Sequence, residues 1–157
     1  MEIFKMVSSD ELTNLIVDFV KSVQKVSSQL DILFHISRES FEIVRVCLDK
    51  LFIRFAACAH NYNRINQLYE NKIQLNFVPF QHCSLVYNCF LWTQHVRKRT
   101  NDLKHHLSLW YDENFKNREI KAIFQSNMQK LVMWEDVFEF LSKAIEDSFM
   151  ADCVVSL

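Results

Sequence analysis

The sequence contains no glycine and a single proline, Pro79. Tight hairpin turns between β-strands need residues with positive φ, which glycine supplies most readily. Glycine is also required by phosphate-binding loops, by the dinucleotide-binding fingerprint and by the nucleophile elbow of hydrolases. The lack of glycine therefore excludes these enzyme motifs and argues against a β-rich domain, which leaves helices joined by polar loops.

Long apolar runs and an excess of charge of one sign are absent as well. The longest uninterrupted apolar run is Phe55–Ala59, whereas a membrane-spanning helix needs about 20 apolar residues. The formal net charge of −1 gives no overall field that would attract a polyanion such as nucleic acid. We therefore predict that neither a membrane nor a nucleic acid is a partner.

The five cysteines are an odd number, and no two of them stand in a Cys-x-x-Cys pair. No apolar secretory segment follows Met1. Unpaired thiols of this kind are typical of a reducing compartment, where a buried cysteine serves as a small apolar side chain. We therefore expect an intracellular, cytoplasmic location.

The sequence does contain apolar residues at alternating spacings of three and four, which is the heptad pattern of packed helices. Four segments carry this pattern, at about 9–35, 40–73, 79–111 and 118–150. Because the breaks between them are short, neighbouring helices should run antiparallel. The predicted fold is all-α, a single domain over 1–157 that forms an elongated antiparallel four-helix bundle with coiled-coil-like packing.

The heptad pattern is regular in the first two segments and looser in the last two. The regular positions are Leu12, Ile16, Phe19, Val23, Val26, Leu30 and Leu33, followed by Phe41, Val44, Leu48, Leu51, Phe55, Cys58, Tyr62, Ile65 and Tyr69. In the looser segments the apolar positions are Leu85, Cys89, Trp92, Val96, Leu103 and Trp110, followed by Ile120, Phe124, Leu131, Trp134, Phe138, Leu141 and Ile145. The polar residues Arg99, His106 and Asn127 also occupy heptad positions. Polar residues at such positions can set the register of packed helices; alternatively, they mark where the heptad assignment has drifted.

The segment 40–73 carries a second set of apolar residues beside its heptad positions. The set consists of Ile43, Val46, Ile53, Ala56 and Ala57. A helix that is apolar over a wide arc is usually covered on more than one side. We therefore expect this helix to pack between its neighbours.

Motifs that would place a metal or a cofactor between helices are missing. Di-iron bundles use Glu-x-x-His and helical zinc hydrolases use His-Glu-x-x-His, and neither occurs here. The stretch from His82 to His95 also contains Cys83 and Cys89, but its ends would lie about 20 Å apart on a helix, too far for one zinc ion. We predict no catalytic residue, no metal and no cofactor.

Two surface features point to a protein partner. The stretch 93–106 is dense in cations, and several phenylalanines stand at predicted helix ends or loops, where they can form an apolar contact surface. The predicted partner-binding residues are Arg97, Lys98, Arg99, Lys104, Phe77, Phe80 and Phe115. The other interpretation of the cations is a solvated helix face.

Part of the chain resembles a known family. CLDK at Cys47–Lys50, YNRINQLYENK at Tyr62–Lys72, and the stretch ending in Leu107–Leu109 carry the resemblance, together with Cys83, Tyr87, Phe90 and Leu91. Over Cys47–Leu109 these residues look like the helical scaffold-dimerisation region of the non-canonical IκB kinases, TANK-binding kinase and IκB kinase epsilon. The resemblance implies a non-catalytic part or relative of a cytoplasmic signalling kinase that dimerises through helices and recruits adaptor proteins. The kinase Gly-rich loop, catalytic loop and ubiquitin-like segment are missing from this sequence.

Together these features predict a non-catalytic scaffold module for protein–protein interaction, not an enzyme. It would mediate dimerisation or adaptor recruitment in an intracellular signalling assembly, either as a homodimer or with a different protein. The alternative is a small helical-bundle enzyme, or a cofactor or metal carrier, with a site between helices.

Overall fold

The computed structural model describes residues 9–36, 40–70, 80–114 and 117–147. Four helices account for nearly all of them: α1 (Ser9–Ile36), α2 (Phe41–Glu70), α3 (Phe80–Asn114) and α4 (Arg118–Ile145). Their lengths of 28 to 35 residues correspond to rods of about 42 to 53 Å. The predicted all-α bundle is confirmed.

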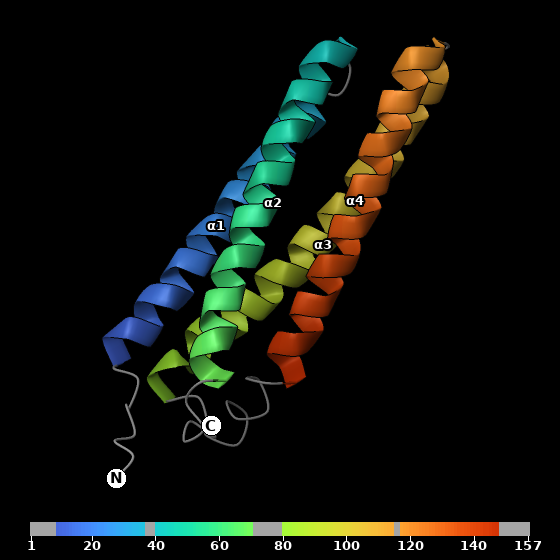
Figure 1. Cartoon of the computed structure of the whole chain (residues 1–157). Helices are drawn as coiled ribbons and strands as arrows, with labels where there is room; N and C mark the ends of the chain where they lie inside the picture. The colour runs from blue at the N-terminus through green and yellow to red at the C-terminus, as the bar shows by residue number, and fades with distance from the viewer. Residues whose placement is uncertain (1–8, 37–39, 71–79, 115–116, 148–157) are drawn as a thin grey trace.

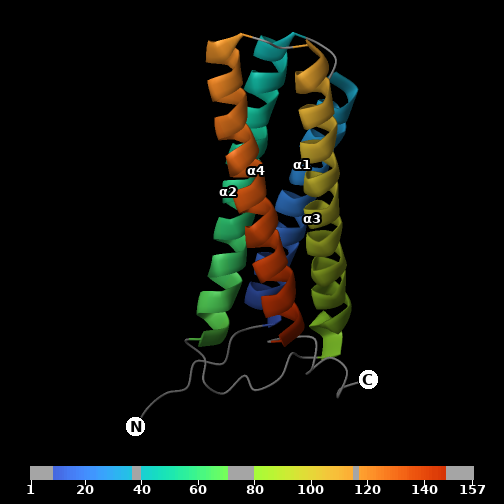
Figure 2. The same ribbon diagram turned by 90° about the vertical axis from the view of Figure 1, so that its right-hand side faces the viewer.

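The helices lie at the corners of a square and alternate in direction along the chain (Figures 1 and 2). α1 packs against α2 and α3, and α3 also packs against α4. The fourth side of the square, between α2 and α4, is the least closely packed. α1 with α2 and α3 with α4 each form an antiparallel hairpin, so α2 and α4 run in the same direction. The two hairpins are joined chiefly through the contact between α1 and α3.

Burial follows the heptad pattern in α1, α2 and α4. The heptad residues that are buried there are Ile16, Phe19, Val23, Val26, Leu30, Leu33, Phe41, Val44, Leu48, Leu51, Phe55, Cys58, Tyr62, Ile65, Phe124, Asn127, Leu131, Phe138, Leu141 and Ile145. Their alternating spacing places them on one side of each helix, where they face the other helices. One continuous core runs along the bundle.

Aromatic rings join the helices at several levels of this core. Phe55 of α2 is fully buried and stacks on Trp134 of α4, with 5.3 Å between ring centroids. Its ring also lies 5.2 Å from that of Phe138. Tyr111 stacks on Phe124 at 4.3 Å, which links α3 to α4 near their connecting loop. α3 itself continues to Asn114, beyond the predicted end at 111.

The expectation that the second apolar set of α2 packs between neighbours is wrong. Ile43, Val46 and Ile53 are 46 %, 44 % and 70 % exposed, and Ala56 and Ala57 are exposed as well. The heptad face of α2 alone meets the core, because among the described residues no helix covers its outer side. These apolar side chains therefore form a surface.

In α3 the expected positions Cys89, Val96, Leu103 and Trp110 are buried, but the positions between them had been assigned one residue too early. Thr100 and Leu107 are buried in the core, whereas their neighbours Arg99 and His106 lie beside Phe34 of α1. The Thr100 hydroxyl donates a hydrogen bond to the Val96 carbonyl at 2.7 Å. A threonine that satisfies its hydroxyl within its own helix can occupy an apolar core without an unpaired polar group.

Within the described part of the chain, no helix has a stretch long and apolar enough to cross a membrane.

α4 begins with a polar cap, in which the Asn117 side chain accepts a hydrogen bond from the Glu119 backbone N–H at 2.9 Å. Such a cap satisfies one of the donors that every helix start leaves without an intrahelical partner.

Candidate interaction surfaces

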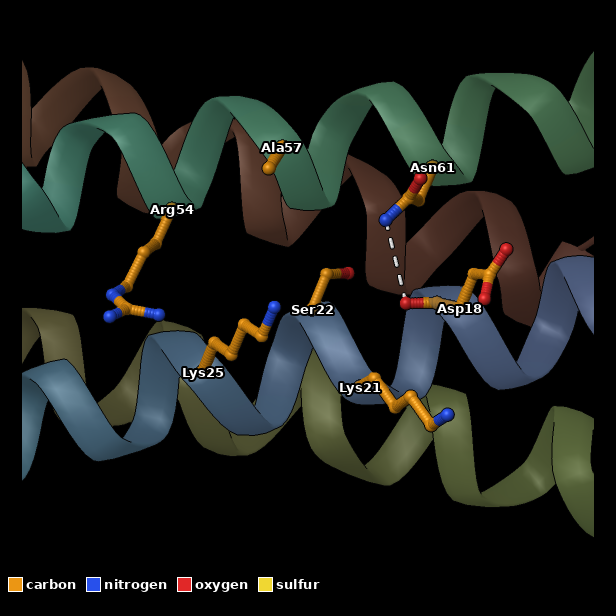
Figure 3. A pocket seen from close by; sticks show the side chains of 7 residues that line it. All are labelled: Asp18, Lys21, Ser22, Lys25, Arg54, Ala57 and Asn61. Carbon is orange, nitrogen blue, oxygen red and sulfur yellow. Dashed lines mark hydrogen bonds between the residues drawn. The ribbon is translucent and has the colours of Figure 1, made fainter.

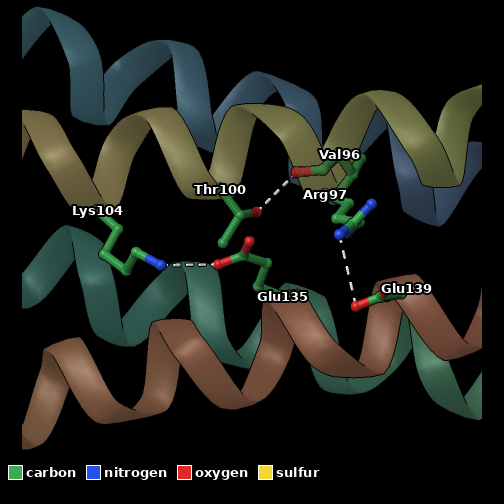
Figure 4. A network of polar contacts seen from close by, with 6 residues as sticks. All are labelled: Val96, Arg97, Thr100, Lys104, Glu135 and Glu139. Atoms are coloured by element: carbon green, nitrogen blue, oxygen red, sulfur yellow. Dashed lines mark hydrogen bonds and ion pairs between the residues drawn. The ribbon is translucent and has the colours of Figure 1, made fainter.

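The cations of the predicted basic patch mostly pair with carboxylates of neighbouring helices. Lys104 Nζ lies 3.0 Å from Glu135 Oε2, and Arg97 Nη2 lies 3.5 Å from Glu139 Oε2 (Figure 4). These two ion pairs join α3 to α4. On the side of α3 that faces α1, Arg99 pairs with Asp31, so this cation joins α3 to α1.

The structure therefore gives three of the seven predicted partner-binding residues a role inside the bundle. Lys98 is exposed on the same helix. Phe80 begins α3, but its side chain, like the whole of Phe77 and Phe115, lies outside what the structure describes. Binding of a partner by any of these residues remains a prediction.

The Lys104–Glu135 pair is the more buried of the two that join α3 to α4, with exposed side-chain fractions of 23 % and 18 %. Lys104→Met is expected to lower the free energy of unfolding by about 1–3 kcal/mol, because it leaves a largely buried carboxylate without its cation. Urea unfolding would measure this loss. Adding Glu135→Leu should restore most of it.

Arg97→Met provides the matched control for Lys104→Met. The side chains of Arg97 and Glu139 are 45 % and 57 % exposed, and ion pairs in such positions contribute at most about 1 kcal/mol. Equal losses for the two single variants would contradict the assignment of Lys104 as a structural residue.

A first groove lies between α1 and α2 and has a volume of about 230 Å³. Lys25 of α1 and Arg54 of α2 extend toward the same opening (Figure 3). Asp18, at the other end of the groove, is 3.8 Å from Arg64, and its backbone carbonyl accepts a hydrogen bond from Asn61. The groove therefore carries positive charge, but all of its charged side chains are at least partly exposed.

A second groove, of about 390 Å³, lies between α2 and α4, the pair of helices that pack least closely. Its lining residues are Arg45, Asp49, Ala122, Ile123, Ser126, Asn127 and Lys130. Two N–H groups of this lining, Asn127 Nδ2 and Arg45 Nε, are buried without a hydrogen-bond partner among the described residues. No comparable pair of buried donors lines the α1–α2 groove.

Exposed apolar side chains border this second groove on both helices. On α4, Ile123 lines the groove and is 40 % exposed, and Met133, one turn beyond Lys130, is 51 % exposed. On α2, the exposed Val46 and Ile53 lie one turn before and one turn beyond Asp49. We call the surface formed by Val46, Ile53, Ile123, Met133 and the groove lining the α2–α4 face.

Among the described residues, no group of three or more histidine, cysteine or carboxylate side chains could hold a metal ion. Burial raises the pKa of the Cys58 thiol and of the Cys89 thiol from the ordinary 9.0 to about 12. A neutral thiol is a poor nucleophile and a poor metal ligand. These two cysteines are therefore core residues and do not form a reactive site.

Sequence reasoning identified Asn127 and the apolar residues of α2 but did not connect them. Asn127 stood out as a polar heptad position, and Val46 and Ile53 as a second apolar set. Only the packing of α2 beside α4 brings the two signals to one face. Comparisons with protein-family models, with curated proteins and with solved structures found no match.

Proposed function

We propose that this protein is a non-catalytic interaction module that binds an amphipathic helix of a partner protein against the α2–α4 face. The exposed apolar side chains of that face carry the proposal. Ile53 is 70 % exposed and Met133 is 51 % exposed, on the two helices that leave a groove between them. Apolar side chains gathered beside a groove are typical of sites where one protein receives a helix of another.

A bound helix would complete a packing unit that the bundle leaves open. Its apolar side chains would enter the groove between α2 and α4 and remove Val46, Ile53, Ile123 and Met133 from water. Full burial of an aliphatic side chain contributes about 1.5–3 kcal/mol, and these side chains, 40 % to 70 % exposed in the free bundle, would contribute the part that corresponds to their exposed surface. In this proposal the module acts as a scaffold in an intracellular signalling assembly, the role that the resemblance to the non-canonical IκB kinases implies.

Ile53→Asp is expected to weaken partner binding at least tenfold while leaving the bundle folded, because it places a charge on the contact surface and none in the core. Affinity capture from cell extract, quantified by mass spectrometry, would compare wild type with this variant. Ile32→Asp is the matched control, since Ile32 is an isoleucine on α1 and is 46 % exposed. Loss of the same proteins in both variants, or in neither, would contradict the proposal.

A second copy of the chain could also occupy this face. Light scattering over a concentration series would give the molar mass in solution. A dimer that dissociates in Ile53→Asp and persists in Ile32→Asp would identify the partner as the chain itself.

The alternative of an enzyme or carrier predicts a metal or chromophore in freshly purified protein, which elemental analysis and an absorbance spectrum would detect.

A further inference from the structure

The groove between α2 and α4 has two buried donors without a hydrogen-bond partner in its lining. Asn127 is only 4 % exposed, and its Nδ2 has no hydrogen-bond partner in the described part of the chain. Arg45 Nε is also buried without a hydrogen-bond partner among the described residues. Both atoms are donors, and buried donors without acceptors are rare in folded proteins because they have lost their hydrogen bonds to water. Although Asp49 and Ser126 also line the groove, neither donor is hydrogen-bonded to them or to any other described residue.

One cation beside these donors, Lys130, is available to pair with a negatively charged acceptor. Arg45 and Lys130 line the groove as cations and Asp49 lines it as an anion, and Glu42 beside the groove is ion-paired with Arg45. One nitrogen of the Arg45 guanidinium, Nη2, is already bound to Glu42 on the same helix, which fixes the group while leaving Nε unpaired. Lys130 Nζ lies 5.5 Å from the Phe52 ring centroid and has no ion pair with a described residue.

We propose that the helix bound at the α2–α4 face presents a glutamate or aspartate side chain to Asn127 Nδ2 and Arg45 Nε. This inference rests on the proposed function and states which chemistry the partner must have. The carboxylate accepts hydrogen bonds from both donors and is attracted by Lys130, while apolar side chains of the same helix contact Ile53 and Met133. Charge-assisted hydrogen bonds of this kind are the strongest that side chains form.

A helix suits this site better than a free small acid does. The groove opens along two parallel helices, and apolar side chains border it above and below the donors. A small acid would satisfy the donors but would leave Val46, Ile53 and Met133 exposed. An amphipathic helix with a carboxylate among its apolar positions would satisfy both requirements, as coiled-coil helices do with a polar residue in an apolar seam.

The test is a selection from a displayed library of amphipathic peptides of about three heptads. Apolar residues are fixed at the seam in most members, and one seam position and all flanking positions vary. The full-length protein is the bait, and peptides that also bind Ile53→Asp are removed. We expect the retained peptides to carry glutamate or aspartate at one fixed distance from their apolar residues.

Binding of the best peptide is then measured by fluorescence anisotropy. We expect Asn127→Leu and Arg45→Met each to weaken it about 10- to 100-fold. Replacing the glutamate of the peptide by glutamine should weaken its binding to the wild-type protein by a similar factor. The same replacement should weaken its binding to Asn127→Leu and Arg45→Met only slightly further. Arg97→Met is the control for a general loss of positive charge, since Arg97 lies on α3 and pairs with α4.

The outcomes separate the two proposals. If no peptide depends on Ile53, the proposed helix-binding face is wrong. If peptides depend on Ile53 but carry no common carboxylate, or bind Asn127→Leu and Arg45→Met as well as wild type, the face stands and the carboxylate inference is overturned. Asn127→Leu replaces a buried, unpaired amide by an apolar side chain and so should fold; Arg45→Met alters a side chain that is 38 % exposed.

Discussion

Phe55→Asp is expected to leave no stably folded protein. Phe55 is fully buried and its ring contacts Trp134 and Phe138 at the centre of the bundle. Loss of a buried phenylalanine alone costs about 3–5 kcal/mol, and a buried, unpaired carboxylate adds several more. The sum reaches the total stability of about 5–15 kcal/mol that is typical of a domain. Circular dichroism should show the loss of helix, and no cooperative urea transition should remain.

Ile53→Asp, two positions away, makes the same chemical change on the outer side of α2. Ile53 is 70 % exposed, so the free energy of unfolding should change by about 0.5 kcal/mol or less. Phe55→Ala should fall between the two, folded but about 3–5 kcal/mol less stable. A folded Phe55→Asp protein, or an unfolded Ile53→Asp protein, would contradict the assignment of inner and outer faces to α2.

Alkaline pH is expected to destabilise the protein through its two buried thiols. Burial raises the pKa of Cys58 and of Cys89 from 9.0 to about 12, whereas in the unfolded chain both ionise near the ordinary value. The unfolded state therefore binds fewer protons above pH 9, so stability falls as the pH rises from 9 toward 12. At pH 10 the loss relative to neutral pH should be about 1–2 kcal/mol for each thiol.

Urea unfolding between pH 8 and 10.5 would measure this dependence, and Cys58→Ala and Cys89→Ala isolate the part that each thiol contributes. Each variant starts from a lower stability at neutral pH, because a buried side chain has been shortened. Its loss of stability between pH 9 and 10.5 should nevertheless be smaller than that of wild type. Equal slopes in wild type and in both variants would show that other groups cause the alkaline destabilisation.

Most of the fold could be predicted from the sequence because apolar residues mark the buried side of three helices directly. From Phe41 to Ile65 every heptad position of α2 is buried as expected; the side chain of the next one, Tyr69, lies outside what the structure describes. In α3 the same reasoning failed at Thr100, because the sequence does not show that a polar side chain will hydrogen-bond within its own helix. The Thr100 hydroxyl donates to the Val96 carbonyl, so this residue can be buried. Arg99, whose long side chain reaches Phe34 and Asp31 of α1, was assigned the core position instead.

The α2–α4 face could not be predicted in the same way. Heptad spacing shows which side of a helix is buried, but it does not show which helices become neighbours or how closely they pack. For that reason Val46 and Ile53 were interpreted as covered, and Asn127 as a register position without a place on a surface. The sequence did contain two signals of this face. One was the apolar pair Val46 and Ile53 outside the heptad positions of α2, and the other was the polar Asn127 at a heptad position of α4.

The uneven packing of the square has a mechanical consequence. α1 and α3 are in close contact, whereas α2 and α4 are joined mainly by the rings of Phe55, Trp134 and Phe138. A relative rotation of the two hairpins about the line between α1 and α3 would therefore disturb the fewest contacts. The distance between α2 and α4 changes most in such a rotation, since both helices lie away from the axis. A helix bound between α2 and α4 would resist that rotation. Binding would then make the bundle stiffer and change its shape little.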